Sequence, residues 1–394
     1  MISVTEAKQI IKDHCKALQP VVIKLSEAHG KILAKDLFST FDIPAFPQSS
    51  MDGYAFNFDG YMQYKILQIA GEIAAGDKLN ILLEENAAVR IFTGAAVPTG
   101  ADTVVMQERT SVENNRLFIM DENIKAGSNV RARGSEIKKN VLALENGSLL
   151  TAGAIGFLAG IGITEVLAYP SPFVTIIVTG NELQSPGLPL QHGQVYESNS
   201  FALEAALRTL GINTIITERV DDNLSGIESA LQNALMQSDI VLLTGGVSVG
   251  DYDFVVKAAE NCAVEKRFHK VKQKPGKPLY FGNKASKIVF GLPGNPSSVL
   301  TCFYQYVVPA IHILQNRPCM IKEMKADLVN AYNKPTGFTH FLKGYYSGTK
   351  VSILPGQESY RMQSFAKANC LIEFDETVSQ ASEGEPVKIY MLSC

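Results

Sequence analysis

The stretch Phe173-Val-Thr-Ile-Ile-Val178 begins the alternation of strand and helix patterns that decides the fold. A helical pattern follows at 200–210, a strand at Thr214-Ile-Ile-Thr217, a second helical pattern at 224–236 and another strand from Ile240. This βαβαβ order predicts a multidomain α/β protein whose central domain has a parallel-type sheet. Such sheets bind their ligands at the carboxyl ends of the strands.

Three turn-rich loops are expected at that edge, each interpreted as following an apolar strand-like run. They are Gly245-Gly-Val-Ser-Val-Gly-Asp-Tyr-Asp253, Lys274-Pro-Gly-Lys-Pro278 and Gly291-Leu-Pro-Gly-Asn-Pro-Ser-Ser298. Glycine lets the backbone approach a ligand closely, a helix N-terminus attracts anions, and lysines supply positive charge. The three loops therefore predict a cradle for a phosphorylated ligand.

Carboxylates accumulate at the same strand ends. Asp251 and Asp253 lie in the first loop, Glu182 follows the first strand, and Asp221 and Asp222 follow the next one. Carboxylates beside a phosphate repel it unless a divalent cation lies between them, so magnesium (Mg2+) is implied. Each residue alone is also compatible with a glycine turn, a helix cap or a solvated side chain, and only their convergence favours a site.

The second and third loops each have a simpler explanation as well. Lys274 and Lys277 lie three apart in a turn that proline fixes, although exposed lysines usually serve solubility. Asn295 is the predicted N-cap, Pro296 the first helical residue and Ser298 a first-turn residue, which an ordinary capped helix would also contain.

Composition sets the broad class. The chain has 394 residues, 46% of them hydrophobic and 19% charged, which favours a soluble protein of two to four domains. A formal net charge of −3 argues against nonspecific nucleic-acid binding. The six cysteines show no zinc or disulfide spacing, and residues 1–19 have the pattern of an amphipathic helix. We therefore expect a cytoplasmic protein with no membrane partner, in which the charge-free stretch 148–164 is a buried helix packed through its small residues.

The pattern changes along the chain predict four domains. Residues 1–45 plus 141–170 are expected to form a discontinuous helical linker or dimerisation domain, interrupted by a mostly β insertion at 46–140. Residues 171–316 form the α/β domain, and residues 317–394 a small C-terminal β domain.

Several motifs occur together in a specific order. They are Ser50-Met-Asp-Gly-Tyr-Ala55, Thr93-Gly-Ala95 with 98–108, Thr179-Gly-Asn-Glu-Leu183, Thr244-Gly-Gly-Val-Ser-Val-Gly250, Lys274-Pro-Gly-Lys-Pro278 and Gly291-Leu-Pro-Gly-Asn-Pro296. In this order the chain resembles the MoeA-type molybdopterin molybdenumtransferases, the family that includes the gephyrin E domain. The resemblance extends over essentially the whole chain.

The resemblance implies a four-domain subunit with a MogA-like molybdopterin-binding domain. It implies a homodimer that takes adenylated molybdopterin and molybdate, inserts the metal into the dithiolene and releases AMP with magnesium present. Molybdopterin adenylyltransferase and molybdoenzyme delivery proteins are further candidate partners. Two other classes stay open, because the same fold occurs in proteins that bind the pterin without this turnover and in a scaffold that clusters receptors.

The resemblance also implies roles for individual residues. Catalytic roles fall on Asp253, Glu182, Asp222 and Asp52, of which the first three would hold magnesium. Substrate contacts fall on Thr93, Arg131, Gly245, Gly246, Ser248, Lys274, Lys277, Pro293, Asn295, Pro296 and Ser298, with molybdate near the third loop. Asn181 and Glu136 stand where the family usually has aspartate. The layout further implies a cleft shared between subunits, with Asp52 and Thr93 of one chain facing the Asp253 loop of the other.

Overall fold

A computed structural model describes residues 1–77, 81–246, 254–318 and 323–392. The chain divides into two compact units. The first contains Met1–Ile23, Gly30–Ala34 and Leu167–Cys394, and the second contains Lys24–His29 and Lys35–Val166.

The first unit is built on a six-stranded sheet. Its strands, in order, are β16 (Ile215–Val220), β13 (Val174–Thr179), β17 (Ile240–Thr244), β21 (Lys287–Leu292), β20 (Tyr280–Lys284) and β18 (Glu265–His269). The first four are parallel, but β20 runs antiparallel to both β21 and β18. The sheet is therefore mixed, and the expectation of a parallel-type sheet holds for four of its strands.

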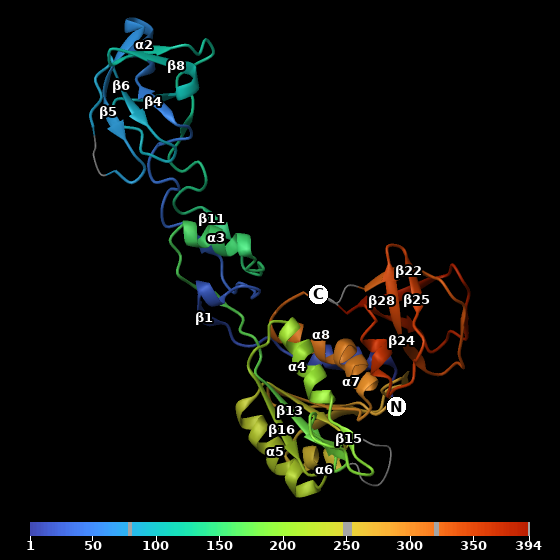
Figure 1. The fold of residues 1–394 in the computed structure, drawn as a ribbon. Coiled ribbons are helices and arrows are strands. Elements are labelled where there is room, and N and C mark those ends of the chain that lie inside the picture. The colour runs from blue at the N-terminus through green and yellow to red at the C-terminus, as the bar shows by residue number, and fades with distance from the viewer. Residues whose placement is uncertain (78–80, 247–253, 319–322, 393–394) are drawn as a thin grey trace. The chain divides into compact units, whose positions relative to one another are not determined.

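Helices cover both faces of this sheet (Figure 1). One face carries α1 (Val4–His14), α4 (Asn199–Thr209), α7 (Pro296–Cys302) and α8 (Val308–Leu314), and the other carries α5 (Leu224–Gln237) and α6 (Phe254–Asn261). Side chains alternate along β13, so Ile176 packs into the first layer and Ile177 into the second, and both are fully buried. Each such side chain contributes about 1.5–3 kcal/mol relative to its exposed state.

The N-terminal helix α1 belongs to the first of these layers. Ser3 and Glu6 form a capping box at its start, and Val4, Ala7 and Ile11 are buried at helical spacing. The amphipathic pattern is thus confirmed, and its apolar face packs into the core of the α/β domain. The four domain boundaries given above stay a prediction.

A long apolar helical run closes the same layer. It consists of α7, the π-helical η3 (Phe303–Val307) and α8. Among the described residues, this run at Pro296–Leu314 is the one helix long and apolar enough to cross a membrane, but 83% of it is buried inside the protein. It has the burial of a core helix.

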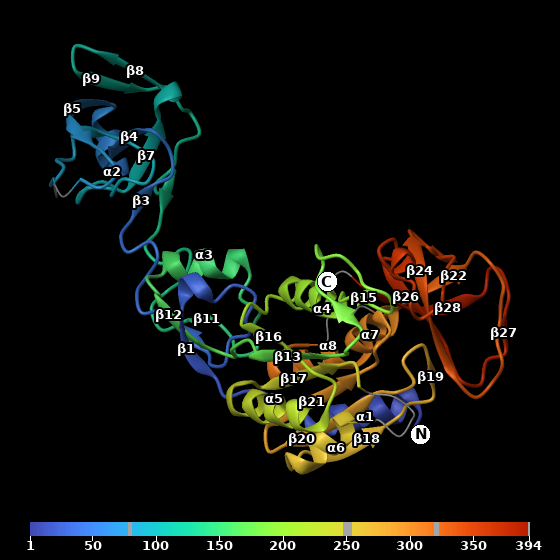
Figure 2. The same ribbon diagram turned by 60° about the horizontal axis from the view of Figure 1, so that its bottom comes forward.

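The C-terminal part is a small β-barrel (Figure 2). Its strands are β22 (Glu323–Leu328), β24 (Thr339–Ser347), β25 (Lys350–Ile353), β26 (Cys370–Phe374) and β28 (Pro386–Met391), and a pairing of β24 with β26 closes the ring. A short strand from the α/β domain, β19 (Gln273–Lys274), pairs in parallel with β24. Smaller elements of this part are α9 (Met362–Phe365), β23 (Tyr332–Asn333) and β27 (Gln380–Ala381). The α/β domain also contains the short strands β14 (Leu183–Gln184) and β15 (Val195–Tyr196).

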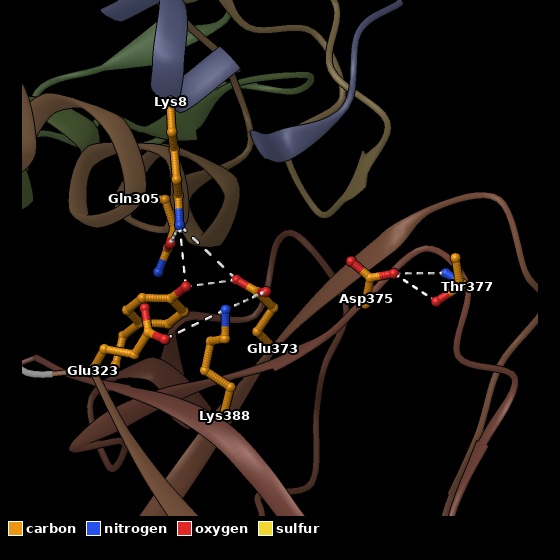
Figure 3. A network of polar contacts seen from close by, with 8 residues as sticks. Lys8, Gln305, Glu323, Glu373, Asp375, Thr377 and Lys388 are labelled. Atoms are coloured by element: carbon orange, nitrogen blue, oxygen red, sulfur yellow. Dashed lines mark hydrogen bonds and ion pairs between the residues drawn. The ribbon is translucent and has the colours of Figure 1, made fainter. Parts of the chain in front are cut away.

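Polar contacts also join this barrel to the α/β domain (Figure 3). The Lys8 ammonium of α1 donates to Gln305 Oε1 of η3 at 2.8 Å and to the Tyr390 hydroxyl of β28 at 3.2 Å. Tyr390 in turn donates to Glu373 at 2.7 Å, and Lys388 lies 3.4 Å from the same carboxylate. The network connects three segments that are far apart in sequence.

The second unit contains another six-stranded sheet. Its order is β7 (Thr103–Met106), β4 (Gly53–Phe56), β6 (Ala87–Ile91), β5 (Ile66–Ile73), β9 (Arg116–Ile119) and β8 (Thr110–Glu113). The remaining elements between residues 21 and 168 are β1 (Val21–Lys24), η1 (Leu25–Glu27), β2 (Leu37–Phe38), β3 (Gln48–Ser49), α2 (Phe58–Tyr64), η2 (Gln107–Arg109), β10 (Val130–Arg131), β11 (Leu142–Leu144), α3 (Ala152–Gly160) and β12 (Glu165–Ala168).

Helix α3 corrects one expectation. Within the charge-free stretch, Ala152–Gly160 is helical, but Leu158 is the one buried residue of this helix. A side chain added at Gly156 or Gly160 would meet nothing within 4 Å. The small residues therefore do not mediate close packing within this structure, and the prediction of a buried helix was wrong.

Candidate functional site

The strand ends bring the sequence-predicted loops to one edge of the sheet. Strands β13, β17 and β21 are parallel and end at Thr179, Thr244 and Leu292, so the segments that follow them emerge side by side. The 274–278 loop precedes its strand β20, contrary to the expectation that it follows one. It reaches the same edge because β20 is antiparallel and Tyr280, at its start, lies opposite Gly291 near the end of β21.

Two glycines allow these loops to approach one another. Gly245 has a φ of +89°, and an added Cβ would lie 2.1 Å from the backbone oxygen of Thr179. Gly276 has a φ of +87°, and an added Cβ would lie 2.5 Å from Cys302 Sγ. A residue with a side chain would be strained at both positions and would also clash. Gly245 thus lets two loop backbones approach each other, and Gly276 lets the lysine loop lie against the Cys302 side chain.

A cleft of about 1190 Å³ opens at this edge, within the first unit. The sequence-predicted residues that line it are Glu182, Asp222, Gly245, Gly246, Lys274, Lys277, Pro293, Asn295, Pro296 and Ser298. Ser248, Asp251 and Asp253 lie outside the described residues. Ten residues from five separate segments therefore meet in one place.

The acidic side of the cleft contains Asp222 and Glu182. Asp222 is half-buried, and burial followed by repulsion from Glu182 raises the pKa of its carboxyl above the ordinary value, while the Thr179 hydroxyl opposes this to a smaller extent. Atom Oδ1 of Asp222 is buried and has no hydrogen bond of good geometry to the described residues. Asn181 accepts a hydrogen bond from the Asp222 backbone N–H at 3.3 Å, so the amide supports the turn.

The basic side contains Lys274 and Lys277. Neither ammonium has an ion-pair partner within the described parts of the chain. The loop between them is fixed from inside by the buried Gln273, whose Nε2 donates to the Gly276 carbonyl at 3.0 Å and whose Oε1 accepts from the Tyr306 hydroxyl. The lysines are therefore held on a rigid turn, with their charges available to a ligand.

The third loop carries Asn295 to the start of α7. Asn295 occupies the N-cap position as predicted, but its side chain makes no capping bond and instead donates to Ser359 Oγ at 2.9 Å. The backbone N–H of Ser297 donates to the Ser359 carbonyl at 3.0 Å. The helix start is thus fastened to the C-terminal barrel, while Ser298 lies in its first turn and is 3% exposed.

Several cleft residues were missed by the sequence reasoning. Asn199 donates to Thr244 Oγ1 at 2.8 Å and to the Gly294 carbonyl at 2.9 Å, which ties two of the loops together. The others are Val195, Tyr196, Glu197, Ser198, Gln273, Pro335, Thr336, Phe338, His340, Gln357, Glu358, Ser359 and Tyr360. The polar run Glu197-Ser-Asn199 before α4 was a usable signal, whereas the barrel residues follow no strand of the sheet and gave none.

His340 adds a neutral imidazole to the cleft at neutral pH. Burial, with smaller effects from Lys334 and Lys274, lowers the pKa of this histidine to about 4. Its Nδ1 is 2.8 Å from the Tyr332 hydroxyl. The side chain is therefore fixed in orientation and uncharged.

The remaining predicted residues belong to the second unit. The Asp52 carboxylate accepts hydrogen bonds from the N–H of Thr93 at 2.8 Å and from its hydroxyl at 2.7 Å, and these bonds lower the pKa of Asp52. Arg131 in β10 and Glu136 are both exposed. The structure thus joins Asp52 to Thr93.

Comparisons with known families match almost every part of the chain. Residues 2–162 match the MoeA N-terminal region (domain I and II), residues 175–313 a probable molybdopterin binding domain, and residues 325–392 the MoeA C-terminal region (domain IV). Apart from Val174, the six-stranded sheet of the α/β domain and the loops at its edge fall within the second match, and the barrel wall of the cleft falls within the third. These matches place the chain among the multidomain proteins of molybdenum cofactor biosynthesis.

Individual relatives narrow the class. A molybdopterin molybdenumtransferase of Haemophilus influenzae is 35% identical over 94% of this chain and 93% of the relative, and molybdopterin molybdenumtransferase 2 of Mycobacterium tuberculosis is 31% identical over the full length of both. A crystal structure of the molybdopterin biosynthesis MoeA protein from Pyrococcus horikoshii has a TM-score of 0.84 and 28% identity, with complete coverage of both chains. The chain belongs to the MoeA family of molybdopterin molybdenumtransferases.

Proposed function

We propose that this chain inserts the metal of molybdate into adenylated molybdopterin and releases AMP. The observation that supports this most directly is the cleft itself. Its lining combines two lysines that form no ion pair with any described residue, a pair of carboxylates and glycine-rich loops. Such a site suits a ligand that carries several negative charges and is held next to a cation.

Lys274 and Lys277 are assigned to binding of the phosphorylated pterin. Their ammonium groups are donors for phosphate oxygens, and the buried Gln273 keeps the turn that carries them in place. Gly245 and Gly246 allow the backbone to approach the same ligand. These residues orient the substrate and offset its charge.

Asp222 and Glu182 fit a divalent cation. The buried Oδ1 of Asp222 and the repulsion that raises its pKa are features that a bound magnesium ion would relieve. Within the described ranges no group of three His, Cys, Asp or Glu side chains could hold a metal, so a third ligand would come from Asp253, which lies outside those ranges. When bound, magnesium would neutralise the phosphates and polarise the bond that releases AMP.

Molybdate, as co-substrate, is assigned to the third loop. Ser298 offers a hydroxyl beside the helix that begins at Pro296, and Pro293 and Asn295 shape the turn before it. Backbone amides at a helix start suit a tetrahedral oxyanion. This places the oxyanion close to the lysine turn, because Ser298 and Gly276 are neighbours.

The second unit is assigned to the same reaction through a homodimer. Asp52, held by Thr93, together with Arg131 would complete the cleft of a partner subunit. Mixing inactive Asp52→Ala and Asp222→Ala proteins should then restore partial activity, because a heterodimer would contain one intact cleft. Verified heterodimers without any recovery would show that each chain builds its own site. A cytoplasmic location and contact with the adenylyltransferase complete the proposal.

The central experiment measures AMP release from adenylated molybdopterin with and without molybdate. Lys277→Ala should weaken pterin binding by roughly 1.5–3 kcal/mol, about 10- to 150-fold in the dissociation constant. Lys266→Ala is the matched control, because Lys266 is exposed on β18 and does not line the cleft. Release that is independent of molybdate would reject the proposed function, and equal affinities for the two variants would reject the role of Lys277.

A further inference from the structure

One wall of the cleft is a loop of the C-terminal barrel, residues 356–361. Gln357, Glu358, Ser359 and Tyr360 of this loop line the cleft. Ser359 also contacts the start of α7 through two hydrogen bonds, one from Asn295 at 2.9 Å and one from the Ser297 N–H at 3.0 Å. The conformation of the loop therefore determines the shape of the site next to Ser298.

A buried lysine holds this loop from behind. Lys343 lies in β24 and is 2% exposed. Its ammonium donates to the carbonyls of Gly356 at 2.8 Å, Arg361 at 3.1 Å and Glu358 at 3.4 Å. These three bonds use all three donors of the group, and the bonded carbonyls span the whole loop.

The environment of Lys343 is unusual for a lysine. It has no ion pair with any described residue, and burial lowers the pKa of its ammonium, an effect that Glu358 opposes. A buried charge is expensive unless hydrogen bonds satisfy it, and here backbone carbonyls supply them. Lys343 is buried, so a role in solubility does not explain its position, and it does not line the cleft, so direct contact with a ligand does not explain it either.

Other bonds converge on the same loop. The Gln357 side chain accepts from the Lys343 N–H at 2.9 Å and donates to the Lys343 carbonyl at 2.9 Å. The Ser364 hydroxyl donates to the Gly356 carbonyl at 2.6 Å. A second buried lysine, Lys334, donates to the Phe338 carbonyl at 2.8 Å in the neighbouring cleft loop. Both barrel loops at the cleft are thus organised around an ammonium group.

We propose that Lys343 is a positioning residue for the reaction, whose ammonium keeps the 356–361 loop in the conformation that completes the cleft. Three carbonyl dipoles converge on one cation, so loss of the cation leaves them buried and facing one another. Without the ammonium, the 356–361 loop would become ordered only when the ligand binds. The free-energy cost of this ordering would reduce the apparent affinity for the ligand. The functional part of this inference rests on the proposed function.

The test compares Lys343→Met, which keeps the length of the side chain without its charge, with Lys343→Arg, which keeps the charge. Lys350→Met is the matched control, because Lys350 is exposed on the neighbouring strand β25. Hydrogen exchange of residues 356–361 is measured first, on the protein without ligand. KM and kcat for molybdate-dependent AMP release are measured second.

For Lys343→Met we expect exchange of the loop to be at least about tenfold faster, the KM for the pterin or molybdate to rise about tenfold, and kcat to stay within about twofold. Lys343→Arg should recover part of the loss, and Lys350→Met should behave like the wild type. Unchanged exchange in Lys343→Met overturns the inference, as does faster exchange with an unchanged KM. A fall in kcat alone also overturns it, because a preorganised binding wall acts on KM.

If Lys343→Met does not fold, Ser364→Ala replaces it. This change removes a donor from the Gly356 carbonyl while the lysine stays, and Ser364 does not line the cleft. Faster loop exchange with a raised KM supports the inference, and faster exchange with an unchanged KM contradicts it. The exchange arm needs no substrate, so a wild type without AMP release would count against the proposed function while the exchange data still decide whether Lys343 orders the loop.

Discussion

Replacing Gly245 by alanine should destabilise the protein much more than the same replacement at Gly348. Both glycines have a positive φ, +89° and +68° respectively, so alanine should be strained by about 1–2 kcal/mol at either position. An added Cβ would lie 2.1 Å from the backbone oxygen of Thr179 at Gly245, whereas at Gly348 it would meet nothing within 4 Å. The clash can be relieved only by moving backbone, an overpacking strain of about 1–3 kcal/mol.

We therefore expect Gly245→Ala to lower the free energy of unfolding by about 2–5 kcal/mol and Gly348→Ala by about 1–2 kcal/mol. Urea denaturation followed by circular dichroism measures both, with the midpoint compared at an unchanged slope. The Gly245 variant should also lose pterin affinity, because the two loops at the strand ends would separate. Equal losses of stability in the two variants would refute the close approach of these loops.

Three further predictions concern the cleft. Asp222→Asn should raise the thermal midpoint measured in a chelator, because the raised pKa of Asp222 means that its charged carboxylate opposes folding beside Glu182. The same change should reduce the stabilisation of the protein by magnesium. A lower midpoint in the chelator would contradict this prediction. The free energy of unfolding should fall as the pH decreases from 6.5 towards 4, because His340 is protonated in the unfolded chain but not in the folded protein, where its pKa is about 4. His340→Asn should make this fall shallower. An unchanged pH profile in this variant would exclude the contribution of His340. Asn295→Ala should lower the free energy of unfolding, measured by urea denaturation, by about 0.5–1.5 kcal/mol, because the hydrogen bond to Ser359 is lost. The same variant should lose more affinity for molybdate than for the pterin.

The sequence predicted the part of the fold that local pattern encodes. The strands β13 and β17 are apolar runs bounded by turn residues, and the helices α4 and α5 show helical spacing, so all four were found close to their true bounds. The direction of β20 was not predictable, because an apolar run has the same composition in parallel and antiparallel pairing. The sequence therefore predicted a parallel-type sheet, and only the structure shows that the sheet is mixed.

The candidate site shows the same division. Residues that follow parallel strands were predicted to converge, because one topological rule places all carboxyl strand ends together. Ser359 was missed because its contact with Asn295 joins residues 64 positions apart and no local pattern records it. The N-cap preference of asparagine predicted the correct position for Asn295. Its side chain, however, donates a hydrogen bond to Ser359 and does not cap the helix.

The parallel pairing of β19 with β24 makes the two sides of the cleft thermodynamically dependent on each other. Lys274 is the last residue of β19, and its partner in the barrel strand is His340. A ligand that binds the lysine turn must therefore also favour the state in which the barrel is docked on the α/β domain. By reciprocity, the docked barrel increases ligand affinity by the same free energy. A substitution in the barrel core, far from every charged group in the cleft, will weaken ligand binding to the extent that it loosens this docked strand.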